Sequence, residues 1–138
     1  AIVGNGFRYD GYACFRIKDV RSLEVPSKRC DVYERVLKAR KLKIPPSPPL
    51  RFDTLKNLLI SANKHFPFIA VATEKQYPDE CYIGRIVSVT DKHLFLPQID
   101  AGASWDETPY KYVLEQITNV SMGSDYENGL YEISLFPN

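Results

Sequence analysis

The sequence predicts a mainly β protein: a small, strongly bent antiparallel barrel, with two helices and an incomplete second barrel unit added. Short apolar stretches follow one another from Phe66 to Met122, and turn residues separate them. Gly84 stands inside the longest stretch, where a missing side chain allows a sharp bend or a close backbone approach. Two helical patterns precede this region. Small barrels need such bends to close, so these observations predict one.

The barrel region contains five predicted strands, which are Phe66–Thr73, Cys81–Thr90, His93–Ile99, Tyr110–Glu115 and Ile117–Met122. The last two strands are joined by Glu115 and Gln116 with almost no loop. Pro97 lacks an N–H group, which predicts an edge or bulge position. The pattern over Ser124–Leu135 fits a short helix or an extra strand, and both remain open.

Two helices and a proline segment come before the barrel. Apolar residues three and four apart predict a helix over Asp31–Leu42 and another over Thr54–Lys64, with Asp53 as the N-cap of the second. The segment Ile44–Leu50 has four prolines and predicts a stiff polyproline spacer, or alternatively a ligand for SH3 or WW domains. We therefore divide the chain into a partial barrel unit (1–43), a proline-rich linker (44–51) and a helix with the barrel and tail (52–138).

The chain also contains a weak internal repeat. Two predicted strands, Tyr12–Ile17 and Val20–Val25, are joined tightly by Lys18 and Asp19. They align with the end of the barrel at a constant offset of 97, which pairs Phe15 with Tyr112, Ile17 with Leu114, Val20 with Ile117, Ser22 with Asn119, Leu23 with Val120 and Val25 with Met122. The first unit lacks its early strands, and a further N-terminal segment of about 60 residues would complete it. Alternatively, the remnant pairs with the second barrel or with a partner chain.

Composition and charge limit the kinds of protein that this chain can be. A chain of 138 residues forms one domain or two very small ones, and no apolar run is long enough to span a membrane. Three widely spaced cysteines fit neither a disulfide framework nor a zinc site, which predicts a cytoplasmic protein. Residues 1–64 carry a net charge of +8 and residues 65–138 one of −7. This asymmetry predicts an electrostatic partner, and the two halves can partner each other within one chain or across a dimer.

The strand order, the bend at Gly84 and the tight corner at Glu115-Gln116 resemble the Sm-like and SH3-like small-barrel superfamily, including uncharacterised bacterial proteins with two barrel-type units. The resemblance covers Phe66–Val120 and implies a single helical turn at that corner. Sm-like proteins commonly bind RNA as rings. Their RNA-contact signatures, Asp-x-x-Asn and a basic residue followed by glycine, are not found at matching positions of this sequence.

Basic side chains concentrate in residues 28–51 and form the candidate site for nucleic acid or an acidic partner. The candidates are Lys28, Arg29, Arg35, Lys38, Arg40, Lys41, Lys43 and Arg51. Phosphate binding needs such cations on one surface, and stacking needs exposed aromatic rings nearby. Tyr9, Tyr12, Phe15 and Tyr33 are the aromatic candidates.

No catalytic constellation, phosphate loop, cofactor motif or metal-ligand spacing is visible in the sequence. The acidic turn residues are the weakest candidates for chemistry, and they are Asp79, Glu80, Asp91, Asp100, Asp106 and Glu107. The sequence therefore favours a non-catalytic interaction module that binds a protein partner or itself through strand edges and charge. The alternatives are RNA or DNA binding through residues 28–51, and an enzyme that uses the acidic turns.

Overall fold

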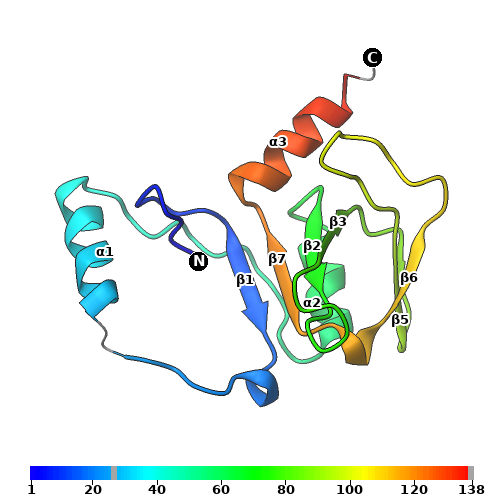
Figure 1. Cartoon of the computed structure of the whole chain (residues 1–138), viewed down its shortest axis with the longest axis horizontal. Helices are drawn as coiled ribbons and strands as arrows, with labels where there is room; N and C mark the ends of the chain where they lie inside the picture. The colour runs from blue at the N-terminus through cyan, green and yellow to red at the C-terminus, as the bar shows by residue number, and fades with distance from the viewer. Residues whose placement is uncertain (26–27, 137–138) are drawn as a thin grey trace.

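The computed structural model describes residues 1–25 and 28–136, and within them three α-helices and two antiparallel sheets form the fold (Figure 1). The four-stranded sheet has the order β1 (Tyr12–Phe15), β7 (Asn119–Met122), β2 (Ile69–Ala72), β3 (Cys81–Gly84). The three-stranded sheet has the order β4 (Ser88–Val89), β5 (His93–Leu96), β6 (Tyr110–Val113). Single 3₁₀ turns, η1 (Ile17–Asp19) and η2 (Leu114–Gln116), follow β1 and β6. Because the described residues form both helices and strands, the fold is a mixed α and β one rather than mainly β. No strand pairing among these residues closes a barrel.

Each of the five strands predicted between Phe66 and Met122 is present, in a shortened form. The predicted strand Cys81–Thr90 divides into β3 and β4, because the chain leaves one sheet and enters the other just after Gly84. A Cβ atom at Gly84 would lie 2.0 Å from the carbonyl oxygen of Pro97. The predicted close backbone approach at Gly84 is therefore confirmed, and Pro97 lies just beyond the end of β5.

The core lies between the two sheets and helix α2 (Leu55–Ala62). Its buried members are Leu59, Ala62, Ile69, Val71, Ile86, Leu94, Leu96, Tyr112, Leu114, Ile117, Val120 and Met122. Alternate residues of β5 and β7 point into this core, as a strand with one buried face requires. The core thus belongs almost entirely to the second repeat unit and its helix.

Helix α2 begins with a different cap from the predicted one. The hydroxyl of Thr54 accepts a hydrogen bond from the backbone N–H of Asn57 at 3.1 Å, which makes Thr54 the N-cap. The carboxylate of Asp53 instead accepts from the side-chain amide of Asn57 and pairs with Arg51. The prediction of Asp53 as N-cap was wrong, because two adjacent residues both had suitable oxygens.

The C-terminal tail forms helix α3 (Asp125–Ser134), which decides between the two open alternatives. Ser124 and Glu127 form a capping box: the Glu127 carboxylate accepts the Ser124 N–H at 2.9 Å, and the Ser124 hydroxyl accepts the Glu127 N–H at 3.3 Å. Burial raises the pKa of Glu127. Leu130 packs with Phe68 beside the main core, so the helix is fixed next to the start of β2.

Helix α1 (Lys28–Ala39) lies to one side of the sheets, next to the first residues of the chain (Figure 1). It begins three residues earlier than predicted. The rings of Phe7 and Tyr33 lie 4.8 Å apart, and the Arg40 guanidinium donates to the carbonyl of Gly6 at 2.7 Å. Across residues 1–25 and 28–136, no helix has the length and apolar character needed to cross a membrane.

Candidate interaction surface

The internal repeat is visible in the backbone as two copies of one corner. Strand β1 leads into η1 and strand β6 into η2, at the offset of 97 found in the sequence. The residues before the turns match closely, with φ −74° and ψ 128° at Arg16 and φ −76° and ψ 122° at Val113. Those after the turns also match, with φ −75° and ψ 113° at Val20 and φ −70° and ψ 120° at Ile117. The two units therefore share local structure as well as residue class.

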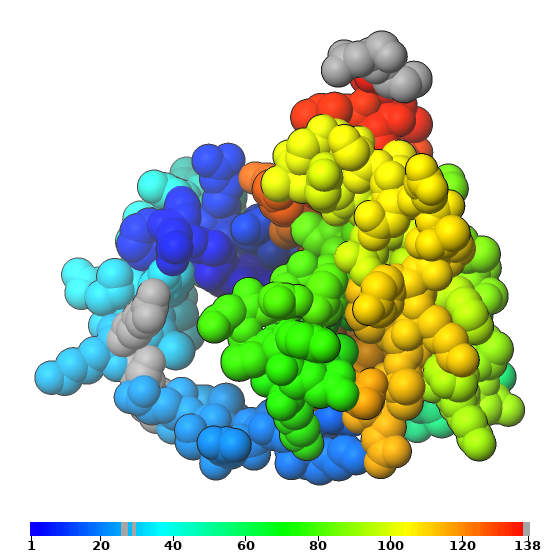
Figure 2. All heavy atoms as spheres, turned by 45° about the vertical axis from the view of Figure 1, so that its right-hand side comes forward, coloured from blue at the N-terminus to red at the C-terminus, as the bar shows by residue number. Residues whose placement is uncertain are grey.

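Beyond the corners the two copies diverge. Residues 119–122 form β7, which pairs with β1 on one side and β2 on the other. Residues 20–25 form no strand with any described residue, so the prediction of a strand over Val20–Val25 was wrong. The physical reason is that alternating residues make a strand only where a partner edge is within reach. Figure 2 shows this segment in blue along the lower edge of the molecule, between η1 and α1.

The apolar side chains that the repeat makes equivalent differ sharply in exposure. We call residues 15–25 the open segment. Four of its apolar residues and their buried counterparts, with the exposed fraction of each residue in parentheses, are Phe15 (57%) and Tyr112 (6%), Ile17 (91%) and Leu114 (8%), Leu23 (82%) and Val120 (2%), and Val25 (75%) and Met122 (0%). Side chains that fill the core of the second unit thus face solvent in the first. A contiguous set of this kind is typical of an interaction site.

Charged contacts anchor the start of the open segment to the second unit. The Arg16 guanidinium donates to the Asp19 carboxylate and to the carbonyl oxygen of Glu115 in η2. Lys75 also pairs with Asp19, at 2.8 Å. The hydrogen bond from Lys75, and then that from Arg16, hold the pKa of Asp19 below its ordinary value. The corner is therefore held in place at neutral pH, and the rest of the open segment extends from it.

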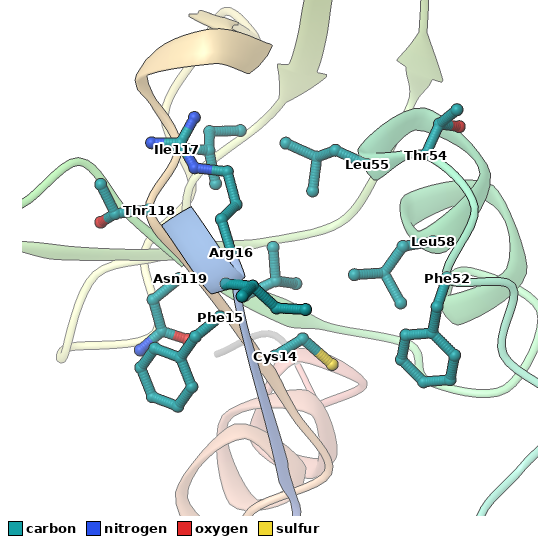
Figure 3. Close-up of a pocket in the computed structure, with 12 residues that line it drawn as sticks. Cys14, Phe15, Arg16, Phe52, Thr54, Leu55, Leu58, Ile117, Thr118 and Asn119 are labelled. Atoms are coloured by element: carbon teal, nitrogen blue, oxygen red, sulfur yellow. The ribbon is translucent and has the colours of Figure 1, made fainter. Parts of the chain in front are cut away.

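An apolar pocket of about 350 Å³ lies beside the open segment (Figure 3). Phe52, Leu55 and Leu58, from α2 and the residues before it, form one side, and the end of β1 with β7 forms the other. Cys14 and Phe15 lie on the β1 side in the close-up. Phe15, Arg16 and Ile17 of the open segment line this pocket, and Phe52 is itself 68% exposed, so the pocket adjoins the start of the open segment.

A second hollow, of about 500 Å³, lies along β6 and is lined by four tyrosines. We call it the tyrosine groove, and its rings are Tyr77, Tyr82, Tyr110 and Tyr112. The Tyr112 ring lies 5.3 Å from that of Tyr82 and 5.2 Å from that of Tyr110. The hydroxyl of Tyr82 donates to the Glu80 carboxylate, which raises the pKa of Tyr82 to about 12. Burial raises the pKa of Tyr112 as well.

The tyrosine groove was not predicted from the sequence. Tyr110 and Tyr112 alternate along β6, and this spacing places both on one face. Their meeting with Tyr77 and Tyr82 depends on how the two sheets are arranged, which no local pattern encodes.

Three basic residues of the sequence-predicted site have hydrogen-bond or ion-pair partners within the chain. Arg40 binds backbone carbonyls of residues 6 and 7, Lys38 pairs with Glu34 at 3.2 Å, and Arg51 pairs with Asp53 at 3.1 Å. Lys28, Arg35, Lys41 and Lys43 are exposed, while the side chain of Arg29 lies outside the described part of the chain.

Two of the four aromatic rings proposed for stacking on bases pack on other rings within the protein. Tyr33 packs on Phe7, and Tyr12 packs on Phe66 and donates its hydroxyl to the carbonyl of Pro46. The proline segment therefore lies against β1 through this contact. No observation adds to the case for nucleic-acid binding through residues 28–51, which stays a prediction.

The acidic turn residues lie in separate places. Asp91 pairs with Lys56 at 2.6 Å, and the hydrogen bond from Lys56 lowers the pKa of Asp91. Asp100 accepts backbone N–H groups of its own loop. Asp79 and Glu107 are exposed, and Glu80 and Asp106 line the tyrosine groove. In residues 1–25 and 28–136, no three His, Cys, Asp or Glu side chains are grouped so as to hold a metal ion.

No protein-family model, curated protein or solved structure matches this chain. Function is therefore inferred from the geometry of the open segment, the apolar pocket and the tyrosine groove.

Proposed function

We propose that this chain is a non-catalytic protein-interaction module of the small SH3- or Sm-like barrel type, which binds a protein partner or itself through the open segment. Two features of the backbone support the barrel assignment. The chain passes from one sheet to the other at Gly84, and a single 3₁₀ turn separates the last two strands of the second unit. In this proposal a partner covers the apolar side chains that the open segment exposes.

The exposure of the open segment is the observation that carries the proposal. Fully burying a large aliphatic or aromatic side chain contributes about 1.5–3 kcal/mol. Phe15, Ile17, Leu23 and Val25 leave most of this contribution unused, whereas their counterparts in the second unit realise it. A protein surface that covers even half of this area therefore gains several kcal/mol.

The backbone of the open segment offers a second source of affinity. The N–H of Val20 donates to the carbonyl of Ile17, while residues 21–25 have no strand partner among the described residues, so their N–H and C=O groups are available to a partner strand. Strand addition to an unpaired segment combines main-chain hydrogen bonds with side-chain pockets on alternate positions. The adjacent apolar pocket supplies such a site for a side chain of the partner.

Sedimentation velocity over a range of concentrations tests this function. We expect the wild-type chain to associate as concentration rises, and the double variant Leu23→Ser, Val25→Ser to sediment as a smaller species. The matched control is Ile133→Ser, Leu135→Ser, because these side chains are 59% and 56% exposed on α3 and its end. This control should associate like the wild type. A monomer at every concentration, or equal loss of association in both double variants, would contradict self-association through the open segment.

A further inference from the structure

We infer that residues 22–25 of one copy pair, as an antiparallel strand, with the outer edge of β6 in a second copy, so that copies join head to tail. This inference rests on the proposed function, since it names the partner as another copy of the chain and names the site on it. Through the repeat, the donated strand and the strand that receives it correspond to two strands that already pair within the chain.

That existing pair is β1 with β7. By the offset of 97, β1 is the counterpart of the region of β6, and Ser22–Val25 is the counterpart of β7. The chain therefore pairs the strand before one corner with the strand after the other corner. The reciprocal pair, β6 with residues 22–25, is the one still open. A head-to-tail contact of this kind generates rings or open chains of copies.

The receiving edge is available. In the part of the chain that the structure describes, β6 ends its sheet and pairs only with β5. The tyrosine groove lies along β6, and Tyr110, Lys111 and Tyr112 of this strand line it. Within one copy the two elements cannot meet, since residues 20–25 run toward α1 while β6 lies on the opposite side of the molecule (Figure 1). A second copy must supply one of them.

The existing pair also fixes the expected register. Ala13 lies opposite Ser121 and Cys14 lies opposite Val120. Adding the offset of 97 to the β1 residues and subtracting it from the β7 residues gives the register of the new pair. Glu24 then lies opposite Tyr110, and Leu23 lies opposite Lys111. Leu23 and Lys111 then share one face of the new pair, and a one-residue slip would put them on opposite faces.

Charge complementarity favours a second copy as the occupant. The open segment belongs to the half of the chain with a net charge of +8, and β6 belongs to the half with −7. A head-to-tail contact brings opposite halves together, whereas a contact of the open segment with itself brings two basic halves together. Opposite net charges favour the head-to-tail contact, and like net charges disfavour the contact of the open segment with itself.

Register-specific disulfide formation tests the inference. In a background with Cys14, Cys30 and Cys81 changed to alanine, we expect the variant with Leu23→Cys and Lys111→Cys to form a ladder of cross-linked species on mild oxidation. Leu23→Cys with Tyr110→Cys is the matched control, because Tyr110 is also exposed but faces the other side of β6. This control, and Leu23→Cys alone, should cross-link at least tenfold less.

The outcomes separate this inference from the proposed function. If wild type associates but the 23–111 pair gives no ladder, or if Leu23→Cys alone cross-links as well, the head-to-tail contact is overturned and the interaction function stands. If wild type is a monomer at every concentration, the head-to-tail contact and the self-binding form of the proposed function are both overturned.

A second measurement needs no thiol background. A chain with Ser22→Pro and Glu24→Pro keeps its β6 edge but cannot donate the strand, so adding it to wild type should cap the assemblies and lower their mean mass by at least half. An unchanged mean mass overturns the inference.

Discussion

Replacing Gly84 with alanine is expected to lower the free energy of unfolding by about 3 kcal/mol, which is the upper end for overpacking a well-packed site. The added Cβ atom would lie 2.0 Å from the backbone oxygen of Pro97, and a backbone atom cannot move aside by a rotamer change. This close approach occurs where the chain leaves β3 for the other sheet. The substitution therefore disturbs both sheets at once. Chemical denaturation followed by tryptophan fluorescence or circular dichroism measures the effect.

Gly129→Ala is the matched control for this prediction. Gly129 lies inside helix α3, and no atom lies within 4 Å of a Cβ atom built there. Alanine is the better helix former, so this variant should gain about 0.5–1 kcal/mol of stability. If Gly84→Ala unfolds at the wild-type denaturant concentration, the bend at Gly84 does not have the role described above.

Leu114→Ala is expected to lower the free energy of unfolding by about 2–5 kcal/mol, whereas Ile17→Ala changes it by less than about 0.5 kcal/mol when the chain is dilute. The two residues occupy the same position of the repeat and both open a 3₁₀ turn. Leu114 is 8% exposed and contributes to the main core, while Ile17 is 91% exposed. The two variants therefore compare the same substitution at a buried and at an exposed copy of the corner.

The measurement requires unfolding curves at two protein concentrations. Association stabilises the folded state by mass action, so the wild type should become more stable as concentration rises. Ile17→Ala should lose part of that gain without losing stability in dilute solution. Equal destabilisation by Ile17→Ala and Leu114→Ala in dilute solution would show that Ile17 is covered within a single copy, which contradicts the open segment.

The features that could be predicted from the sequence were those encoded by local pattern. Alternating residues gave the existence and order of the strands between Phe66 and Met122, because one buried face imposes that alternation. The single glycine in a long apolar strand gave the bend at Gly84. The spacing of the repeat gave both corners, since a 3₁₀ turn between strands leaves the same class pattern wherever it occurs.

The features that could not be predicted depend on what lies next to a segment in space. Val20–Val25 carries the same alternation as β7, yet only β7 has a partner edge within reach. The tyrosine groove joins residues from the two sheets, and no sequence spacing links Tyr77 to Tyr112. The paired state of Arg40 was equally hidden, because its partners are backbone carbonyls about 34 positions earlier in the chain.

Residues 22–25 are expected to gain a strand partner when the chain associates. Hydrogen exchange of the backbone amides of this segment, measured at low and at high protein concentration, is the direct test. We expect fast exchange in dilute solution, at least tenfold slower exchange under associating conditions, and no change for the amides of β2. Equal exchange of residues 22–25 at both concentrations, in a chain that sedimentation shows to be associated, would contradict this strand pairing.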